Sequence, residues 1–308
     1  MIPRTLFYCF GLSPDFGGKP FGLMHYACVQ SALHHIRPDR CVVAFVHEPD
    51  TAWWHRLKRQ IEPRRITAPT EIFGNPLRHY AHQADAWRMA TLLEEGGIYL
   101  DADVLVVRDF APLLANQMVL GLQHDAWGEG LCNAVMLAAP GSAFMRRWHD
   151  SYRSFRSQGR DRFWDEHSVR IPRRLAAEHP DEITILPSTA FFTPGHTPAG
   201  IDRLFADRRP LPPGDAYAHH LWESNAWRPF IDGLSVAELR ARDTAFHRLV
   251  RPYLDDLADD FGLPAGGGFG AGARRTRTRL LPLMRVLDRH APRLAWRVRH
   301  QLLDHAPA

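Results

Sequence analysis

HYAHQADAWRMATLLEEGGIYLDADVLVVRD, residues 79–109, is the stretch around which the rest of the chain has to fold. Residues 80–95 contain no Gly or Pro and are rich in Ala, Leu, Met and Glu, so they favour a helix. The Gly96-Gly97 pair should end this helix, because a left-handed C-cap favours glycine. Residues 98–100 and 104–107 are short and apolar, which predicts two buried strands.

Two carboxylates, Asp101 and Asp103, lie between these predicted strands. In an extended chain, residues two apart point to the same side, so we expect the two acids together. Burying two like charges is costly unless something positive neutralises them. A hard divalent cation that takes oxygen ligands is the natural neutraliser. The pair therefore predicts a metal site.

The predicted helix carries a second polar pair. Asp85 and Arg88 are three residues apart and share one face with Ala81 and Leu92, which indicates that this face points inward. A buried acid and guanidinium should be paired or bound to a polar ligand. Either element alone is commonly structural, as an ion pair or a solvated turn. Their order, Asp-x-x-Arg, Gly-Gly, strand, Asp-x-Asp, strand, favours a functional site.

QADAWRMATLLEEGGIYLDADV, residues 83–104, resembles the signature of glycosyltransferases with the DXD sugar-binding region, of the family 32 type. Their relatives include α-1,4-galactosyl-, α-1,4-N-acetylglucosaminyl- and α-mannosyltransferases. The resemblance implies an α/β fold of the GT-A (Rossmann-like) nucleotide-sugar-binding type with a mixed central sheet. It also implies a nucleotide-sugar donor, with UDP-sugars first, Mn²⁺ or Mg²⁺ as cofactor, and retention of anomeric configuration.

YAHHLWESNAW, residues 217–227, resembles the C-terminal metal segment of the same family. Alignment on Trp222 makes His220 the metal ligand beside Asp101 and Asp103. His219 would then be out of phase and face the other way. Trp222 and Trp227 would close the donor pocket.

The resemblance also implies residues on the sugar and nucleotide sides. Asp85 and Arg88 would hydrogen-bond the hexose hydroxyls, and Tyr99 would lean on the donor. Asn133 matches an Asn that faces the sugar pocket in relatives, with a structural role as the alternative. Phe10, at the end of the first predicted strand, would pack either on the base or in the core. The expected catalytic set is Asp85, Arg88, Asp101 and Asp103.

One segment departs from the family pattern. Relatives often have a Thr-Gly-Pro run next to the donor sugar, whereas residues 163–176 of this chain read FWDEHSVRIPRRLA. The identity of the donor sugar is therefore not determined by the resemblance, and Glu166 and His167 are candidate polar groups for the sugar pocket. Elsewhere, apolar patterns predict strands at residues 5–10, 40–47, 119–124, 133–138 and 183–187 and helices at residues 25–35, 53–61 and within 234–254.

Composition places the chain among globular proteins. Of its 308 residues, 45% are hydrophobic and 23% are charged. The four cysteines show no C-x-x-C spacing, which fits free thiols in a reducing compartment. The sequence has no apolar run of the roughly 18 residues that a membrane span needs, and residues 1–11 lack the layout of a signal peptide. We expect a cytoplasmic protein.

The sequence divides into three parts. Residues 1–263 are expected to form the catalytic domain, and residues 264–273, PAGGGFGAGA, a glycine-rich linker. Residues 274–308 carry nine Arg and two Asp with helical apolar spacing, which predicts a basic amphipathic tail. This tail would bind an anionic membrane surface, making the protein peripheral on the inner face, or would pack on the domain. No RNA-binding pattern accompanies the Arg residues, so nucleic acid is not an expected partner.

The expected function is that of a metal-dependent retaining glycosyltransferase. It would transfer a hexose from a nucleotide-sugar to a glycan or glycolipid acceptor in cell-surface polysaccharide synthesis. Two alternatives remain open at this point. One is a metal-dependent nucleotidyl- or phosphotransferase that uses the same carboxylates, and the other is a non-catalytic sugar-nucleotide-binding protein.

Overall fold

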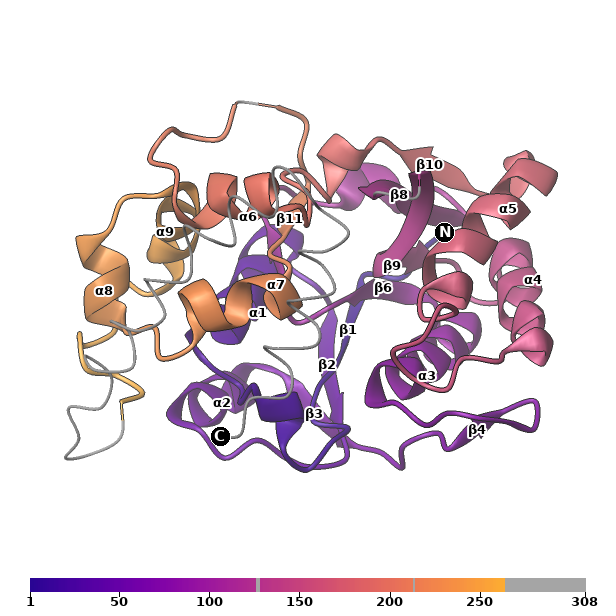
Figure 1. Cartoon of the computed structure of the whole chain (residues 1–308), viewed down its shortest axis with the longest axis horizontal. Coiled ribbons are helices and arrows are strands. Elements are labelled where there is room, and N and C mark those ends of the chain that lie inside the picture. The colour runs from indigo at the N-terminus through magenta and orange to yellow at the C-terminus, as the bar shows by residue number, and fades with distance from the viewer. Residues whose placement is uncertain (126–127, 213, 264–308) are drawn as a thin grey trace.

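A seven-stranded mixed sheet forms the centre of the molecule (Figure 1). The computed structural model describes residues 1–125, 128–212 and 214–263. The strand order in the sheet is β10-β8-β9-β6-β1-β2-β3. The strands span β1 Thr5–Cys9, β2 Arg40–Phe45, β3 Glu62–Arg65, β6 Gly97–Leu100, β8 Met118–Asp125, β9 Gly128–Ala138 and β10 Thr184–Leu186. Strand β9 runs antiparallel to both neighbours, and the other pairs are parallel.

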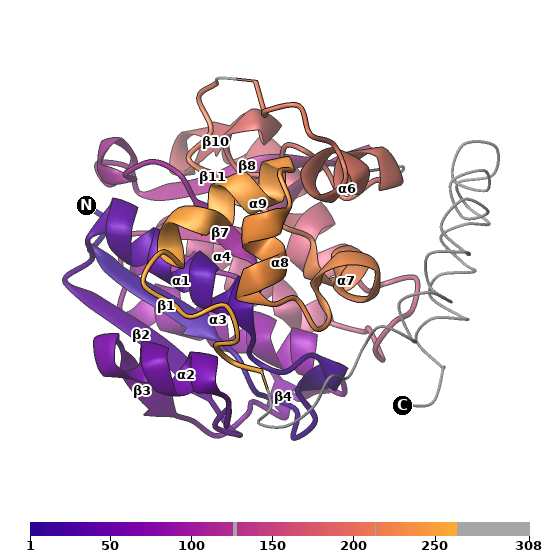
Figure 2. The ribbon, with the colours of Figure 1, turned by 90° about the vertical axis from the view of Figure 1, so that its left-hand side faces the viewer.

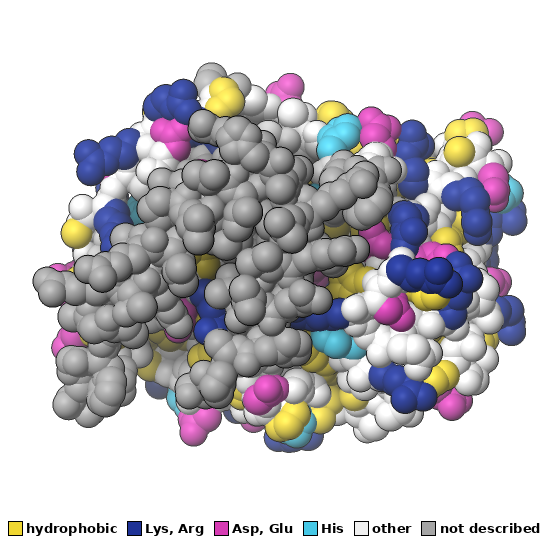
Figure 3. All heavy atoms as spheres, viewed as in Figure 1, with side chains coloured by type: hydrophobic (Ala, Val, Ile, Leu, Met, Phe, Trp, Pro, Cys, Tyr) yellow, Lys and Arg dark blue, Asp and Glu magenta, His cyan; other side chains and the backbone are white. Residues whose placement is uncertain are grey.

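Helices lie on both faces of this sheet (Figures 1 and 2). They span α1 Leu23–Ile36, α2 Ala52–Leu57, α3 Tyr80–Glu94, α4 Ala143–Ser151, α5 Ile171–Glu178, α6 Pro198–Phe205, α7 Glu223–Ala226, α8 Val236–Ala241 and α9 Ala245–Val250. Alternate residues of β1 serve two cores: Leu6 and Tyr8 face α1 and α2, whereas Phe7 faces α3 and α4. A sheet buried on both faces explains why its central strands are apolar throughout. The described surface carries charged side chains, and Figure 3 shows Lys and Arg among Asp and Glu there.

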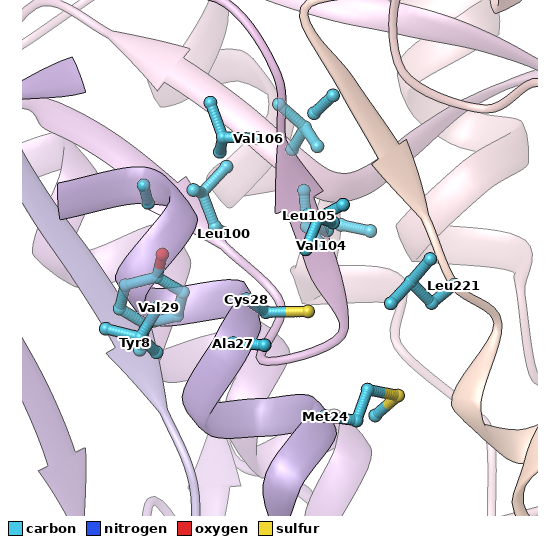
Figure 4. Packing of buried hydrophobic residues seen from close by; sticks show 14 of the residues in the cluster. Tyr8, Met24, Ala27, Cys28, Val29, Leu100, Val104, Leu105, Val106 and Leu221 are labelled. Carbon is cyan, nitrogen blue, oxygen red and sulfur yellow. The ribbon is translucent and has the colours of Figure 1, made fainter. Parts of the chain in front are cut away.

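Two short ladders stand apart from the main sheet. Strand β7 (Val104–Val106) pairs antiparallel with β11 (Ala218–His220), and β4 (Glu71–Ile72) pairs with β5 (Asn75–Pro76). Helix α1 supports β7 from behind, and the Ser31 hydroxyl accepts a hydrogen bond from the Val106 amide at 2.9 Å. Figure 4 shows side chains of α1 beside those of β7 and Leu221. The first ladder therefore joins segments more than 100 residues apart next to the predicted metal motif.

The expected α/β class with a mixed sheet is confirmed, as are the helix at residues 80–95 and the strands that flank the Asp-x-Asp motif. Two expectations were wrong in detail. Residues 101–103 form a turn rather than extended chain, and the Val104 amide donates to the Asp101 carbonyl at 3.0 Å. Strand β9 begins at Gly128, five residues before the predicted start, because β8 and β9 continue as a hairpin beyond the sheet.

The predictions for the linker at residues 264–273 and the tail at residues 274–308 lie outside the described residues. The proposed division of the chain into three parts stays a prediction. No helix within the described ranges is both long and apolar enough to cross a membrane. The four cysteines are free thiols, as expected.

Candidate active site

The side chains of Asp101, Asp103 and His220 meet at the end of β6, and we call this group the metal corner. Each offers one ligand atom, and these atoms all lie within 4.8 Å of one another. The His220 Nε2 atom lies 3.2 Å from Asp103 Oδ1, and the His220 Nδ1 atom is buried without a hydrogen-bond partner. Because the motif is a turn, the two carboxylates converge through the turn and not through strand alternation. Two oxygens and an imidazole nitrogen suit Mn²⁺ or Mg²⁺.

Strand pairing determines which histidine joins the two acids. In the β7–β11 ladder His220 is opposite Val104, and His219 is opposite Leu105. Successive residues of a strand point to opposite sides, so only one imidazole can face the turn. The His219 Nδ1 atom instead lies 2.8 Å from the Thr193 carbonyl oxygen. The structure thus places the histidine selected from the sequence beside the acids and its neighbour away from them.

Burial and neighbouring charges shift the pKa values of Asp101, Asp103 and His220. Burial raises the pKa of Asp101, and the nearby Arg88 guanidinium only partly opposes it. Burial would also raise the pKa of Asp103, but His220 and the Glu223 amide hold that pKa well below its usual range. Burial disfavours the imidazolium of His220, yet Asp103 raises the His220 pKa. The corner thus favours a cation next to Asp103, which is what a metal ion would supply.

A buried polar network continues from this corner toward α3. The Asn133 amide donates to Asp85 Oδ1 at 2.7 Å, and Arg88 Nη1 donates to the Asn133 carbonyl at 2.8 Å. Arg88 Nη2 lies 3.5 Å from Asp85 Oδ1. All three side chains are buried. The predicted inward face of the helix is therefore confirmed, and Asn133 from β9 is its partner.

Arg88 connects this network to the metal corner. Its Nη1 atom lies 3.1 Å from Asp101 Oδ1, which also accepts a 2.9 Å hydrogen bond from the Tyr99 hydroxyl. The guanidinium stacks over the Tyr99 ring at 4.2 Å, and Nε donates to the Ala84 carbonyl. Every guanidinium nitrogen thus has a partner inside the protein. Asp85 Oδ2, by contrast, has no hydrogen-bond partner in the described chain and remains an available acceptor.

Aromatic side chains border the corner. The Phe10 ring is half-buried, stacks on Phe16 at 5.8 Å and meets His25 edge-on at 4.9 Å. The Trp222 ring lies 4.0 Å from His220, and its Nε1 atom donates to the Pro194 carbonyl at 2.9 Å. Trp222 therefore packs against His220, whereas Phe10 contacts the half-buried Phe16 and the buried His25.

Three polar residues of the site were missed from the sequence. Glu223 accepts hydrogen bonds from Lys19 Nζ at 3.0 Å and from His25 Nε2 at 2.6 Å. Its own backbone amide donates to Asp103 Oδ2 at 2.8 Å. His25 and Glu223 carried no local signal. Lys19 did, because it is one of only two lysines in a chain whose other basic residues are all Arg.

Residues 163–176, which depart from the family pattern, contact α4 and the segment that follows it. Glu166 pairs with Arg156 at 2.6 Å, and the His167 Nε2 atom lies 3.2 Å from the Ser151 carbonyl. The Trp148 indole donates to the His167 carbonyl at 2.7 Å. The two candidate pocket residues are thus held by α4 and the segment that follows it.

Acids outnumber permanent cations in the site. Among its described residues, four carboxylates (Asp85, Asp101, Asp103 and Glu223) surround two permanent cations (Arg88 and Lys19). An excess of two negative charges is unfavourable in this partly buried site. One divalent cation at the Asp101, Asp103 and His220 corner would balance it.

A family model described as "glycosyltransferase sugar-binding region containing DXD motif" matches residues 25–120. Glucan organizing enzyme 1 of Cryptococcus neoformans var. grubii is 32% identical over 271 residues, covering 84% of this chain and 73% of the relative. The chain belongs to this DXD glycosyltransferase family. Its α/β fold with a mixed central sheet is as expected, and the GT-A type stays an expectation. Membership of family 32 in particular stays an expectation.

More distant similarities were also found. An uncharacterised protein of Arabidopsis thaliana is 24% identical over 204 residues, which cover 57% of this chain and 30% of that protein. Among solved structures, mouse xyloside xylosyltransferase 1 aligns with a TM-score of 0.42 at 12% identity, over 71% of this chain and 98% of its own. The galactosyltransferase LgtC aligns with a TM-score of 0.40 at 15% identity, over 70% and 86%.

Proposed function

We propose that this DXD-family glycosyltransferase is a metal-dependent, retaining hexosyltransferase that uses a nucleotide-sugar, with UDP-sugars first. The main support for the proposal is that the three candidate metal ligands and the buried Asp85 and Arg88 pair belong to one connected network. The corner formed by Asp101, Asp103 and His220 joins the buried pair Asp85 and Arg88 through a 3.1 Å contact between Arg88 and Asp101. One network can therefore hold a cation at one end and a sugar at the other.

Asp101, Asp103 and His220 would hold the cation, and the convergence of one ligand atom from each residue within 4.8 Å supports this assignment. When bound, Mn²⁺ or Mg²⁺ would neutralise the diphosphate and make it a better leaving group. The Glu223 amide and Tyr99 hydroxyl hold the two carboxylates in place. This preorganisation avoids reordering the ligands during the reaction.

On the sugar side, Asp85 Oδ2 would accept a hydrogen bond from a hexose hydroxyl. Arg88 and Asn133 would position that carboxylate, because both contact its other oxygen. Holding the sugar ring in a fixed orientation can lower the activation barrier by roughly several kcal/mol. Arg88 would act on the sugar chiefly by orienting Asp85 and Asp101.

The proposed transfer breaks the bond between the anomeric carbon and the phosphate oxygen and forms one to an acceptor hydroxyl oxygen. The acceptor proton passes to the leaving phosphate, so the protein need not supply a base. Attack on the face that the leaving group vacates gives retention. The relative's name refers to glucan, and we propose a cell-surface glycan or glycolipid acceptor for this chain as well.

Donor hydrolysis tests the proposal. Purified protein is incubated with UDP-Gal, UDP-Glc, UDP-GlcNAc or GDP-Man, with and without Mn²⁺, and the products are separated. Free nucleoside diphosphate and sugar, released faster with Mn²⁺, are expected. Pyrophosphate would instead indicate a nucleotidyltransferase, inorganic phosphate would indicate a phosphotransferase, and binding without turnover would indicate a binding protein.

The Asp103→Asn variant should lose Mn²⁺-stimulated hydrolysis by roughly 100-fold or more, because it removes an anionic ligand without changing side-chain size. Asp109→Asn is the matched control, since Asp109 follows the same segment but, within the described part of the chain, pairs with Arg4 at 3.3 Å and with the Ala111 amide. Both variants are assayed for hydrolysis and for Mn²⁺ binding by calorimetry. Full activity of Asp103→Asn would contradict the metal assignment.

A further inference from the structure

Lys19 lies in a glycine-rich loop next to the candidate active site. The loop, residues 11–22, connects β1 to α1 and reads GLSPDFGGKPFG. Gly17 and Gly18 adopt the left-handed conformation, with φ of 63° and 72°. The backbone thereby turns so that Lys19 follows the turn and points toward α7, where its ammonium group meets Glu223.

The ammonium group of Lys19 has donor capacity to spare. Its Nζ atom lies 3.0 Å from Glu223 Oε2 and 3.4 Å from the Ser224 hydroxyl. A lysine has three N–H donors, and no described residue accepts the third. The side chain is only 17% exposed, which is unusual for Lys. Arg88, the other permanent cation of the site, has a contact inside the protein at each of its three nitrogens.

Glu223 fixes Lys19 relative to the metal corner. The Gly22 amide donates to His25 Nδ1 at 3.0 Å, so His25 Nε2 carries the proton that it donates to Glu223 Oε1 at 2.6 Å. The Glu223 amide donates to Asp103 Oδ2 at 2.8 Å. Glu223 thus contacts the glycine-rich loop, the start of α1 and Asp103.

We propose that Lys19 Nζ donates its third hydrogen bond to a diphosphate oxygen of the nucleotide-sugar donor, with Glu223 as its positioning residue. This inference rests on the proposed function. The compact ammonium group of lysine, on its flexible stem, binds phosphate as a point charge. The planar guanidinium of arginine instead binds phosphate through two parallel hydrogen bonds. The assignment also gives a reason for a lysine at this place in an Arg-rich chain.

Calorimetry with the full-length protein and Mn²⁺ tests the proposal, with UDP and GDP as probes. Lys19→Met keeps most of the stem but removes the charge, and should weaken binding of the diphosphate roughly tenfold or more. Lys58→Met is the matched control, because Lys58 is the other lysine and pairs with Glu48 on the surface. It should bind like the wild type. Equal affinities of Lys19→Met and wild type would overturn the inference alone.

A double variant separates phosphate binding from simple neutralisation of Glu223. Lys19→Met with Glu223→Gln removes both charges and leaves no unpaired carboxylate. If Lys19 served only to neutralise Glu223, this variant would regain wild-type affinity for UDP or GDP, which would overturn the inference. By our proposal it stays weak, while Lys19→Arg regains part of the affinity. A wild type that binds neither diphosphate and hydrolyses no donor would overturn the proposed function and this inference together.

Discussion

At the scale of single residues, Arg88 determines whether the site holds together. Its guanidinium contacts Asp85, Asp101 and the Asn133 carbonyl and covers the Tyr99 ring. Buried acids need such a partner, because an isolated buried carboxylate is strongly unfavourable. The same residue is therefore expected to affect both stability and activity.

Replacing Arg88 by Ala should lower the free energy of unfolding by about 3–5 kcal/mol, because the buried Asp85 and the half-buried Asp101 lose their partner. Arg4→Ala is a suitable control, since Arg4 pairs with the half-exposed Asp109 and its loss should cost no more than about 1 kcal/mol. Urea unfolding followed by fluorescence measures both. Similar losses in the two variants would contradict the central position of Arg88.

Local spacing explains which site residues the sequence could predict. Asp85 and Arg88 lie on one turn of a helix, and Asp101 and Asp103 lie in one turn of chain, so short patterns brought them together. The resemblance added His220, and the ladder of β7 with β11 places it beside the acids. The group formed by Lys19, His25 and Glu223 comes from three distant segments and has no such local pattern.

At the scale of elements, the junction between α3 and β6 requires glycine. Gly96 has φ of 65°, and a Cβ atom there would lie 2.5 Å from Pro140 Cδ and 3.0 Å from the Ala138 carbonyl oxygen. The helix must end within one residue so that β6 can enter the sheet beside β1. The predicted glycine C-cap is thus confirmed. Pro140 and Ala138 leave no room for a Cβ atom at this position, so glycine is required.

The Gly96→Ala variant should be much less stable than Gly74→Ala. Both positions have positive φ, which costs about 1–2 kcal/mol for alanine. Only Gly96 adds close contacts with Pro140, worth about 1–3 kcal/mol more, whereas a Cβ at Gly74 meets nothing within 4 Å. Melting temperatures compare the two. Equal shifts would mean that the chain around Pro140 can move aside.

Two strands that the sequence did not predict are polar or very short. Strand β3, EPRR, lies at the edge of the sheet and is mostly exposed, so it lacks the apolar pattern that identifies a strand. Charged residues at an edge strand discourage pairing with other chains. Strand β11 has three residues and exists because β7 offers it a partner. Neither could be recognised without the rest of the fold.

At the scale of the whole molecule, buried histidines make stability depend on pH. Burial lowers the pKa of His247 to about 4, and Arg242 and Arg251 add to this effect against Asp243. The imidazole Nδ1 lies 2.6 Å from the Thr244 hydroxyl. The folded protein therefore keeps this group neutral at pH values where an unfolded chain, with a pKa near 6.5, would bind a proton.

Stability should consequently fall as the pH is lowered from about 6.5 to 4, because the unfolded state binds more protons in that window. In His247→Gln this contribution is absent, so its stability should change less with pH. Urea midpoints at several pH values provide the measurement. Identical pH profiles for the variant and the wild type would show that His247 does not contribute.

The β7–β11 ladder has a consequence for recognising active members of the family in genomes. The aspartates lie within the matched residues 25–120, whereas the imidazole enters from residue 220, opposite Val104. A homologue can therefore keep the aspartate signature intact after losing the partner strand or its histidine. On the proposed metal assignment, surveys that count the aspartate signature alone would include homologues that lack one of the three metal ligands, and checking for an imidazole in register with the residue after the second aspartate would identify them.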